Sequence, residues 1–225
     1  MRPYVGINNT GEMDYYPIYL NLSGRRCVVV GGGKIAEGKV AGLLEAEARV
    51  RVIAPELTPA LADWARQGRL EHHDRAYAIG DLAGAFLVIG ATDEPAVNQQ
   101  VWEEAEALGL LVNVVDDTPH CNFIAPAIVR QGDLAVAIST SGKAPALAVR
   151  LKEHIQELIG PEHARFLELA GSLREPLAER TPEFAARRAL WYQLVDSDVL
   201  DLLRQGEEAQ AAARIAEIMG VAPAP

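Results

Sequence analysis

Three consecutive glycines end a short apolar run, and their spacing suits the binding of a phosphate group. From Gly31 to Ala36 the chain has the spacing G-x-G-x-x-A, a variant of the dinucleotide-binding fingerprint. Gly31 would make the turn, and Gly33 would let the backbone approach a pyrophosphate. The amides of Lys34 and Ile35 would then meet the phosphates at the positive end of the helix dipole. The alternative is a glycine-rich turn that binds no ligand.

The acidic residue that usually binds the ribose is displaced in this chain. The fingerprint expects Asp or Glu about 20 residues later, at the end of the second strand. There the chain reads Ile53-Ala54-Pro55-Glu56. Either Glu56 reaches back to the ribose, or backbone groups of Pro55 and Glu56 serve instead. No arginine follows that could receive a 2′-phosphate, which favours NAD over NADP.

Polar residues also follow two later apolar runs. Thr92 and Asp93 come after residues 85–91, and Asp116 comes after residues 110–115. Ligands of open parallel sheets bind outside the carboxyl ends of the strands, so these side chains should share one edge with Gly33. Asp116 could take a proton from a substrate or help a metal displace protons. Equally, Asp, Thr and Pro at this point could form an ordinary turn.

Three further groups could bind an anion. Ser139-Thr140-Ser141-Gly142-Lys143 offers hydroxyls, amides and an ammonium group, although Ser and Thr before a helix are also ordinary caps. His120 either lines the same site as Asp116 or lies on a surface loop. Arg187-Arg188 lies close to Trp191-Tyr192 and could place two cations beside an aromatic surface, as a large flat polyanion would require. On a helix such a pair is usually a solvated face.

These residues need a scaffold, and the alternation of apolar runs with helical patterns predicts one. Strand-like runs at 25–30, 48–54, 85–91 and 110–115 alternate with helical patterns near 34–44, 58–67 and 96–108. Residues 70–75 could add a short strand. Strands that alternate with helices predict right-handed crossovers and a parallel, doubly wound α/β sheet.

The pattern changes after Pro119. Residues 123–129 and 134–138 predict two strands joined by a turn at 130–133, and a helix follows from Pro145 to about Ile159. From Pro161 onward the pattern is helical. A hairpin of this size is marginal alone, so we expect it to extend a larger sheet in the same chain or across a dimer. The expected domains are 1–115, 116–155 and 156–225.

Composition excludes several classes of function. Among 225 residues, 31 acidic and 21 basic side chains give a net charge of −10. Such a chain repels nucleic acid and anionic membranes, so we expect neither as a partner. Met1 to Glu12 does not have the pattern of a signal peptide, and no apolar run has the length of a membrane span. These features predict a cytoplasmic protein.

Cysteine and histidine give no metal-binding pattern. Cys27 and Cys121 lie far apart, without disulfide or metal-ligand spacing. His72 and His73 would point to opposite faces of a strand, and we expect both to face the solvent. The sequence therefore predicts no metal site.

Taken together, these motifs resemble the precorrin-2 dehydrogenase family of sirohaem biosynthesis, which includes the N-terminal part of sirohaem synthase and a bifunctional dehydrogenase/ferrochelatase. The resemblance runs from about residue 15 to 152, and Arg187-Arg188 through Trp191 looks like the helical end of the family. The motifs are Tyr16-Pro17-Ile18-Tyr19-Leu20, Val30-Gly31-Gly32-Gly33-Lys34-Ile35-Ala36, Ala91-Thr92-Asp93, Asn113-Val114-Val115-Asp116-Asp117, Cys121-Asn122-Phe123-Ile124-Ala125-Pro126-Ala127 and Ser139-Thr140-Ser141-Gly142-Lys143-Ala144-Pro145.

The resemblance implies an NAD-binding Rossmann domain (1–115), a dimerisation region that contains the hairpin (116–155) and a small all-helical domain (156–225). It implies a homodimer that oxidises precorrin-2 to sirohydrochlorin with hydride transfer to NAD⁺. In many members Fe²⁺ is then inserted in the same site. The key carboxylate of the family falls on Asp116, and Asn113 falls among the cofactor-binding residues. Thr140 falls where some members carry a serine that can be phosphorylated.

A substrate with many carboxylates requires concentrated cations in an acidic protein. Lys143, Arg150, Arg187 and Arg188 are the candidates, with His120, Ser139, Thr140 and Ser141 as further substrate contacts. Two other functions remain open from the sequence. One is a regulatory module that senses NAD and contacts a protein partner. The other is a chelatase that keeps the fold but has lost the oxidation step.

Overall fold

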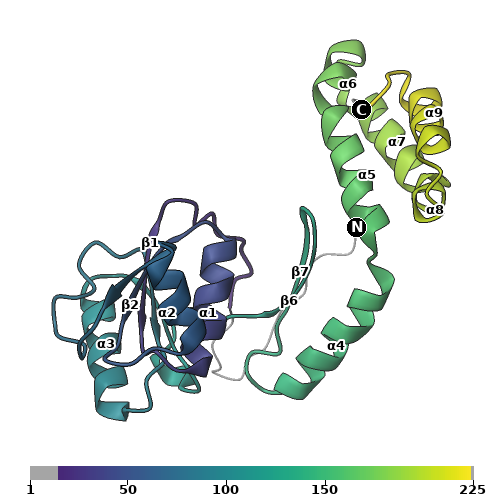
Figure 1. The fold of residues 1–225 in the computed structure, drawn as a ribbon. Helices are drawn as coiled ribbons and strands as arrows, with labels where there is room; N and C mark the ends of the chain where they lie inside the picture. The colour runs from purple at the N-terminus through teal and green to yellow at the C-terminus, as the bar shows by residue number, and fades with distance from the viewer. Residues whose placement is uncertain (1–14, 224–225) are drawn as a thin grey trace, which may run out of the picture. The chain divides into compact units, whose positions relative to one another are not determined.

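The computed structural model describes residues 15–223 (Figure 1). Met1 to Glu12, expected to be free of a signal peptide, lies outside the described residues. The chain divides into two compact units between Ala125 and Pro126. Each unit has a hydrophobic core of its own.

Within residues 15–125, the first unit is a parallel sheet of five strands covered by helices. The strand order is β3-β2-β1-β4-β5, and every neighbouring pair is parallel. The chain starts in the middle of the sheet, builds outward through β2 and β3, and then crosses to the other side of β1. This order confirms the predicted doubly wound fold. The elements are β1 (Arg26–Val30), α1 (Lys34–Glu45), β2 (Arg49–Ile53), α2 (Pro59–Arg66), β3 (Leu70–His73), β4 (Leu87–Gly90), α3 (Pro95–Ala107), β5 (Leu111–Val114) and the 3-10 helix η1 (Thr118–His120).

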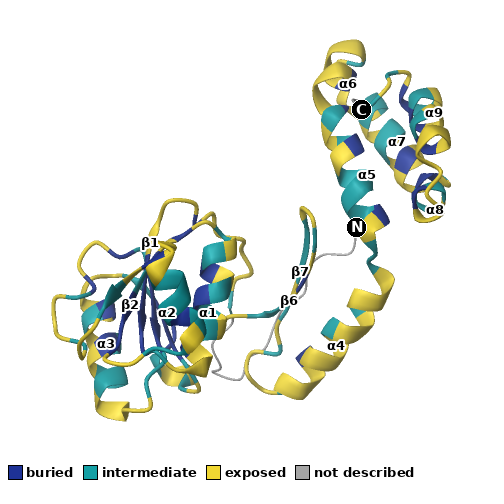
Figure 2. Ribbon diagram, viewed as in Figure 1, coloured by how far each residue is buried: buried dark blue, intermediate teal, exposed yellow. Residues whose placement is uncertain are grey.

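The central strand is buried on both faces, as Figure 2 shows. Successive side chains of a strand point to opposite sides, so β1 contributes to two separate cores. Cys27 and Val29 belong to the core that includes Ala36 of α1 and Leu61 of α2. The opposite core contains Val28, Val30, Val101 and Ala105, the last two from α3. The continuous apolar run before the glycines is therefore explained by burial from both sides.

The second unit contains a β-hairpin and helices. Among its described residues, β6 (Ala127–Gln131) and β7 (Leu134–Ile138) form an antiparallel sheet of two strands. Gly132 makes the turn with φ of 55°. The hairpin, α4 and a helical region are thus confirmed as elements. The helices are α4 (Pro145–Leu158), α5 (Pro161–Ser172), α6 (Arg174–Arg180), α7 (Phe184–Val195), α8 (Val199–Arg204) and α9 (Glu208–Met219).

The predicted start of the hairpin at Phe123 is wrong by four residues, because β6 begins at Ala127. The segment before it is used by the sheet of the first unit. The backbone amide of Asn122 donates to the Val112 carbonyl at 3.0 Å, and Cys121 pairs with Asn113 as an isolated antiparallel β-bridge. Pro126 has no N–H and cannot donate a ladder bond.

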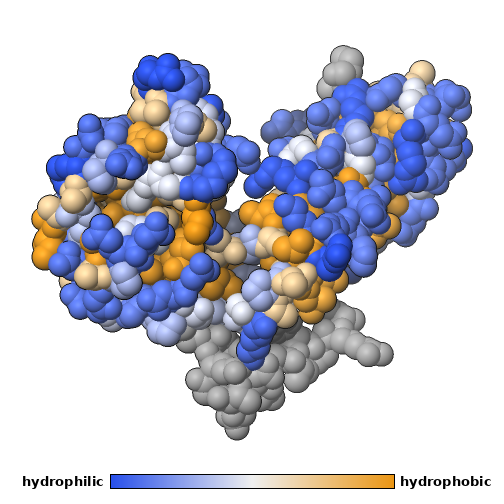
Figure 3. Space-filling view, turned by 60° about the horizontal axis from the view of Figure 1, so that its bottom comes forward, coloured by the Kyte–Doolittle hydropathy of each residue, from blue (hydrophilic) through white to orange (hydrophobic). Residues whose placement is uncertain are grey.

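The hairpin and α4 expose more apolar side chain than the first sheet does. Leu147 and Val149 of α4 are about half exposed, and Ile128 of β6 is 42% exposed. The space-filling view shows hydrophobic residues reaching the surface of each unit between larger hydrophilic areas (Figure 3). Such surface on a two-stranded sheet is what a partner strand or helix would cover.

Two features are absent from residues 15–223. Within this range, no helix has both the length and the apolar content that a membrane crossing requires. The same residues contain no group of three His, Cys, Asp or Glu side chains arranged to hold a metal ion.

The expectation that His72 and His73 face the solvent is wrong, because both are half-buried. His72 Nε2 lies 2.9 Å from the Ala54 carbonyl oxygen, and His73 Nε2 lies 2.7 Å from a Glu71 carboxylate oxygen. The short strand β3 lies beside β2, so its side chains find partners along the sheet.

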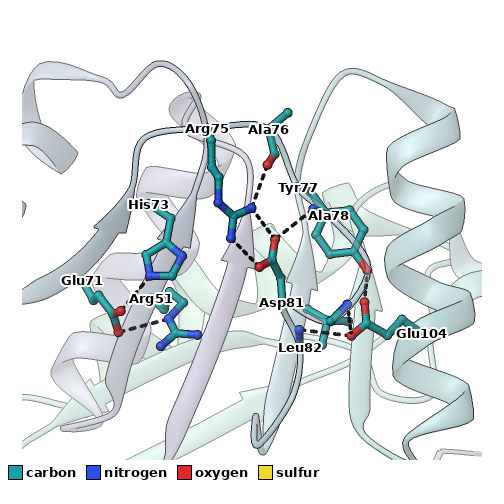
Figure 4. A network of polar contacts seen from close by, with 11 residues as sticks. Arg51, Glu71, His73, Arg75, Ala76, Tyr77, Ala78, Asp81, Leu82 and Glu104 are labelled. Carbon is teal, nitrogen blue, oxygen red and sulfur yellow. Dashed lines mark hydrogen bonds and ion pairs between the residues drawn. The ribbon is translucent and has the colours of Figure 1, made fainter.

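A network of polar contacts fixes the long loop between β3 and β4 (Figure 4). Arg75 donates two hydrogen bonds to Asp81, at 2.6 and 2.7 Å, and the Ala78 amide donates to the same carboxylate. Glu104 of α3 accepts from the amides of Gly80 and Leu82 and from the Tyr77 hydroxyl. The loop is therefore tied within itself and to α3. The hydrogen bonds from Arg75 hold the pKa of Asp81 below its usual range.

Replacing Asp81 with Asn should lower the free energy of unfolding by about 1–3 kcal/mol, since charge-assisted hydrogen bonds are lost. Because the pKa of Asp81 is lower in the folded than in the unfolded state, its carboxylate stabilises the folded state at pH values above the unfolded pKa of about 4. That contribution is lost as the pH falls, so the gap between wild type and Asp81→Asn should shrink in acid. Urea unfolding at pH 7 and in acid measures this.

Both proteins would carry Trp191→Phe, so that Trp64 and Trp102 of the first unit supply the fluorescence signal. Asp63→Asn is the control, because its pair with Arg66 is solvent-exposed and should be worth under about 1 kcal/mol. An Asp81→Asn protein as stable as wild type at pH 7 would contradict the assignment.

Candidate functional site

The glycine turn after β1 lies between two other loops, and its first two glycines have no room for side chains. Gly31 has φ of 122°, and a Cβ added there would lie 2.2 Å from the Ala91 carbonyl oxygen. A Cβ on Gly32 would lie 1.9 Å from the Glu56 carbonyl oxygen. The loops after β1, β2 and β4 therefore meet through backbone atoms. This meeting point is the place where the strand order reverses.

Gly33 differs from its two neighbours because the space beside it is open. No atom lies within 4 Å of a Cβ built on Gly33. This residue is the N-cap of α1, and it caps with no side-chain hydrogen bond. The first amides of a helix have no partner inside the helix, so the N-terminus of α1 presents donors and the positive end of a dipole. The residues present thus fit a pyrophosphate.

The side chain of Lys34 points to a neighbour on its own helix. Its ammonium group pairs with Glu37, one turn along α1, and remains largely exposed. Hydrogen bonds from Lys34 and Thr58 lower the pKa of the Glu37 carboxyl, and the bond from Lys34 has the larger effect. Ile35 is half exposed at the same helix end. Their backbone amides are the groups that the cradle would use.

Pro55 and Glu56 lie beside the glycine turn, as the sequence reasoning requires. Both residues are exposed. Gly31 donates to the Ile53 carbonyl at 2.9 Å, and Thr58 donates to the Gly32 carbonyl at 3.0 Å, so this loop and the turn are bonded to each other. The two alternatives for binding the ribose, the Glu56 carboxylate and the backbone groups of Pro55 and Glu56, therefore both lie next to the glycine turn.

The loop after β4 carries Thr92 and Asp93. The Thr92 hydroxyl accepts a hydrogen bond from the Glu94 amide at 2.8 Å, and Asp93 is exposed. Asn98 of α3 holds the Thr92 backbone through its amide group. The sequence reasoning missed Asn98. A short polar amide among the inward-facing residues of α3 was the signal that could have indicated it.

Asp116 follows β5 in a left-handed conformation, at the carboxyl end of the same sheet. Its φ is 59°, in the left-handed region, and the residue is exposed. The Val115 amide donates to the Gly90 carbonyl at 2.9 Å, which ties this turn to the end of β4. Aspartate adopts this region more readily than most residues, so the conformation fits both an ordinary turn and a functional site.

A buried set of contacts holds the segment after Asp116. The Cys121 sulfur lies 3.1 Å from the Val114 carbonyl oxygen and 3.2 Å from the Asp117 carbonyl oxygen, one on each side of Asp116, and its single S–H is shared between them. Burial raises the pKa of this thiol. The Asn113 amide donates to the Phe123 carbonyl at 3.0 Å. Asn113 thus has a structural contact, and its predicted contact with a cofactor stays a prediction.

His120 is engaged by its neighbours. Its Nδ1 lies 2.6 Å from the Asp117 carboxylate, and its ring centroid lies 4.5 Å from that of Trp102. The imidazole is 27% exposed. Asp117 therefore orients the ring beside the turn that carries Asp116, and a role in substrate binding stays a prediction.

In the second unit, residues 139–143 form a tight turn before α4. The Ser139 hydroxyl accepts from the Ser141 amide at 3.0 Å, and the Thr140 hydroxyl accepts from the Ala144 amide at 3.3 Å. Ser141 has φ of 52°. These bonds give the hydroxyls a role in the local turn, but neither caps α4, whose N-cap is Ala144 and has no side-chain capping hydrogen bond. Further along, Arg150 pairs with Glu153 on the exposed side of α4.

The helical part of the second unit contains a hollow of about 580 Å³ between α6 and α7. It combines cations with aromatic rings. The Arg188 guanidinium lies 5.5 Å from the Tyr192 ring centroid, close enough for a cation–π contact. Arg187 donates to the carbonyls of Thr181 and Pro182. The structure thus gathers the predicted pair of arginines and the aromatic residues. The hollow is lined by Arg174, Ala178, Phe184, Arg187, Arg188, Trp191, Tyr192 and Val195.

Comparison with known proteins identifies the chain. Residues 18–127 match a family model described as NAD(P)-binding, residues 131–158 match the central region of sirohaem biosynthesis proteins, and residues 162–219 match the sirohaem synthase dimerisation region. Together the three models cover most of residues 18–219, so the chain belongs to the precorrin-2 dehydrogenase family, which includes the N-terminal part of sirohaem synthase. The resemblance noted in the sequence is therefore confirmed.

Individual members of the sirohaem synthase family agree along most of the chain. The sirohaem synthase of Chromobacterium violaceum is 40% identical over 203 residues, which are 90% of this chain and 43% of that protein. That of Photobacterium profundum is 43% identical over 88% of this chain and 42% of that protein. The chain spans less than half the length of these relatives. The solved structure of SirC, a precorrin-2 dehydrogenase, matches with a TM-score of 0.71 and 27% identity over 87% of this chain and 98% of SirC.

The glycines of this family member should separate folding from binding. Gly33→Ala should fold as wild type, since its φ of −80° and open surroundings accept a methyl group. It should weaken NAD⁺ binding by about tenfold or more, because the methyl group fills the space for the phosphates. Gly31→Ala should instead lower the free energy of unfolding by about 1–3 kcal/mol. Calorimetric titration and urea unfolding measure the two effects.

Gly38→Ala provides the control, because it lies on α1 with open space around it. Unchanged NAD⁺ affinity in Gly33→Ala would contradict the placement of the phosphates.

Proposed function

We propose that this chain oxidises precorrin-2 to sirohydrochlorin and transfers a hydride to NAD⁺. The observation that carries the proposal is the position of the Asp116 carboxylate. It follows β5 at the carboxyl end of the sheet, where the glycine turn follows β1, and only β4 lies between these two strands. The likeness to SirC and to sirohaem synthases supports the choice of substrate. We also propose that the reaction takes place in the cytoplasm, as the sequence predicts.

The chain supplies position and a base. Bound NAD⁺ would accept the hydride that leaves the substrate. Gly31, Gly33 and the N-terminus of α1 would hold the pyrophosphate through backbone amides. Asp116 would take the proton that is lost along with the hydride, which balances the removal of two hydrogen atoms. Because Asp116 is exposed, its side chain can reach a substrate that lies over the carboxyl end of the sheet.

Cations of the second unit would bind the carboxylates of the substrate. In a chain with a net charge of −10, binding of a polyanion needs a local concentration of positive charge. The hollow between α6 and α7 offers Arg174, Arg187 and Arg188 next to flat aromatic rings. Lys143 and Arg150 remain candidates for the same purpose near the start of α4.

We also propose that the active form is a homodimer. The family model that matches residues 162–219 is named for dimerisation. The two-stranded sheet of β6 and β7, within the described residues, has edges that a second copy could extend. The exposed apolar residues of β6 and α4 support the same conclusion.

Replacing Asp116 with Asn should lower kcat for precorrin-2 oxidation by about 10²–10⁴-fold, the usual contribution of a general base. Asn tolerates the left-handed conformation, so the turn should persist. NAD⁺ affinity should change little. NADH absorbance measures the rate, and Asp74→Asn, at an exposed carboxylate after β3, is the control. Full activity in Asp116→Asn would show that another group is the base.

The same assay distinguishes the other functions. A wild-type protein that binds NAD⁺ but produces no NADH from precorrin-2 would refute the dehydrogenase and favour an NAD-sensing module. Formation of sirohaem from sirohydrochlorin and Fe²⁺ without NAD⁺ would establish a chelatase. In that reaction Fe²⁺ is a substrate, and Asp116 would remove the pyrrole protons.

Replacing Arg188 with Gln should raise KM for precorrin-2 by about tenfold with little change in kcat, since one charge-assisted contact to a carboxylate is lost. Steady-state kinetics at saturating NAD⁺ measure this. Arg214→Gln is the matched control, because Arg214 lies on α9 and pairs with Asp198 and Glu217. An unchanged KM in Arg188→Gln would exclude the hollow from substrate binding.

A further inference from the structure

One side-chain amide of α3 holds the loop that faces the glycine turn. Asn98 Nδ2 donates to the Thr92 carbonyl at 2.9 Å, and the Thr92 amide points to Asn98 Oδ1 at 3.5 Å. The first is a good hydrogen bond and the second is long. A single amide thus faces both backbone polar groups of Thr92. Asn98 is half-buried, so these contacts are shielded from competing water.

Thr92 lies close to the glycine turn, so its position determines how near the loop after β4 comes to Gly31. A Cβ on Gly31 would lie 3.1 Å from the Thr92 nitrogen and 2.2 Å from the Ala91 carbonyl oxygen. The backbone of this loop is therefore in close contact with the first glycine of the fingerprint. Any shift of Thr92 changes the surroundings of the turn directly.

Asn98 also lies against the end of β4. A Cβ on Gly90 would lie 3.2 Å from Asn98 Oδ1, so the absence of a side chain at Gly90 leaves room for the amide. Val101, one turn further along α3, is fully buried under the sheet. The burial of Val101 fixes α3 against the sheet, and the hydrogen bond from Asn98 ties the loop after β4 to this helix.

We propose that Asn98 is a positioning residue for the dinucleotide. It acts through Thr92, by holding the loop of residues 91–94 at the distance from Gly31 that the bound cofactor requires. The inference rests on the proposed function, because it assumes that NAD⁺ occupies this sheet edge. It adds a residue that touches neither the phosphates nor the substrate.

The test compares Asn98→Ala and Asn98→Asp with wild type. Asn98→Asp keeps the volume but cannot donate to the Thr92 carbonyl. Both variants should raise the Kd for NAD⁺ by about tenfold, while KM for precorrin-2 at saturating NAD⁺ stays unchanged. Gln99→Ala is the control on the same turn of α3, since Gln99 bonds Glu103 of its own helix. Direct titration with NAD⁺ gives Kd, and thermal unfolding gives Tm.

The outcomes separate the inference from its premise. A lower Tm with wild-type NAD⁺ affinity in both variants would assign Asn98 a structural role only and overturn the inference. Failure of the wild-type protein to bind NAD⁺ would instead refute the proposed function. Loss of NAD⁺ affinity in both variants, with the Gln99→Ala protein unchanged, would support the positioning role.

Discussion

The close approach of backbone to backbone at Gly31 and Gly32 is the constraint on which the first unit depends. The turn passes between the carbonyls of Ala91 and Glu56 at distances that no Cβ could share. Three loops are thereby joined without side chains, which are the usual means of packing. Gly33 makes no such close contact, and the space beside it at the start of α1 is open. The fold and the proposed phosphate site thus depend on the same three residues.

The polar groups used by the proposed reaction divide between two units with separate cores. The first unit carries backbone amides and a carboxylate, which suit a nucleotide and a proton transfer. The second carries arginines beside aromatic rings, which suit a flat polyanion. The overall negative charge makes this concentration of arginines more informative than it would be in a basic protein.

The fold could be predicted from the sequence because the relevant signals are local. Apolar runs that end in Gly31, Thr92 and Asp116 mark the carboxyl ends of parallel strands, and the structure has those strand ends at one sheet edge. The contacts that hold the site could not be predicted in this way. Asn98 and Cys121 act on backbone carbonyls close in sequence, yet their bonds depend on turns whose geometry no periodicity records. The predicted start of β6 is wrong because Asn122 pairs with β5 instead.

The left-handed conformation of Asp116 restricts how this site can change in evolution. At φ of 59° a residue with an ordinary side chain is strained by about 1–2 kcal/mol, whereas Gly, Asn and Asp are tolerated. Of these three, aspartate alone can accept a proton as an anion. A glutamate would keep the charge but would strain the turn, and an asparagine would keep the turn but lose the base. The conformation and the proposed role as a base therefore favour the same residue, aspartate.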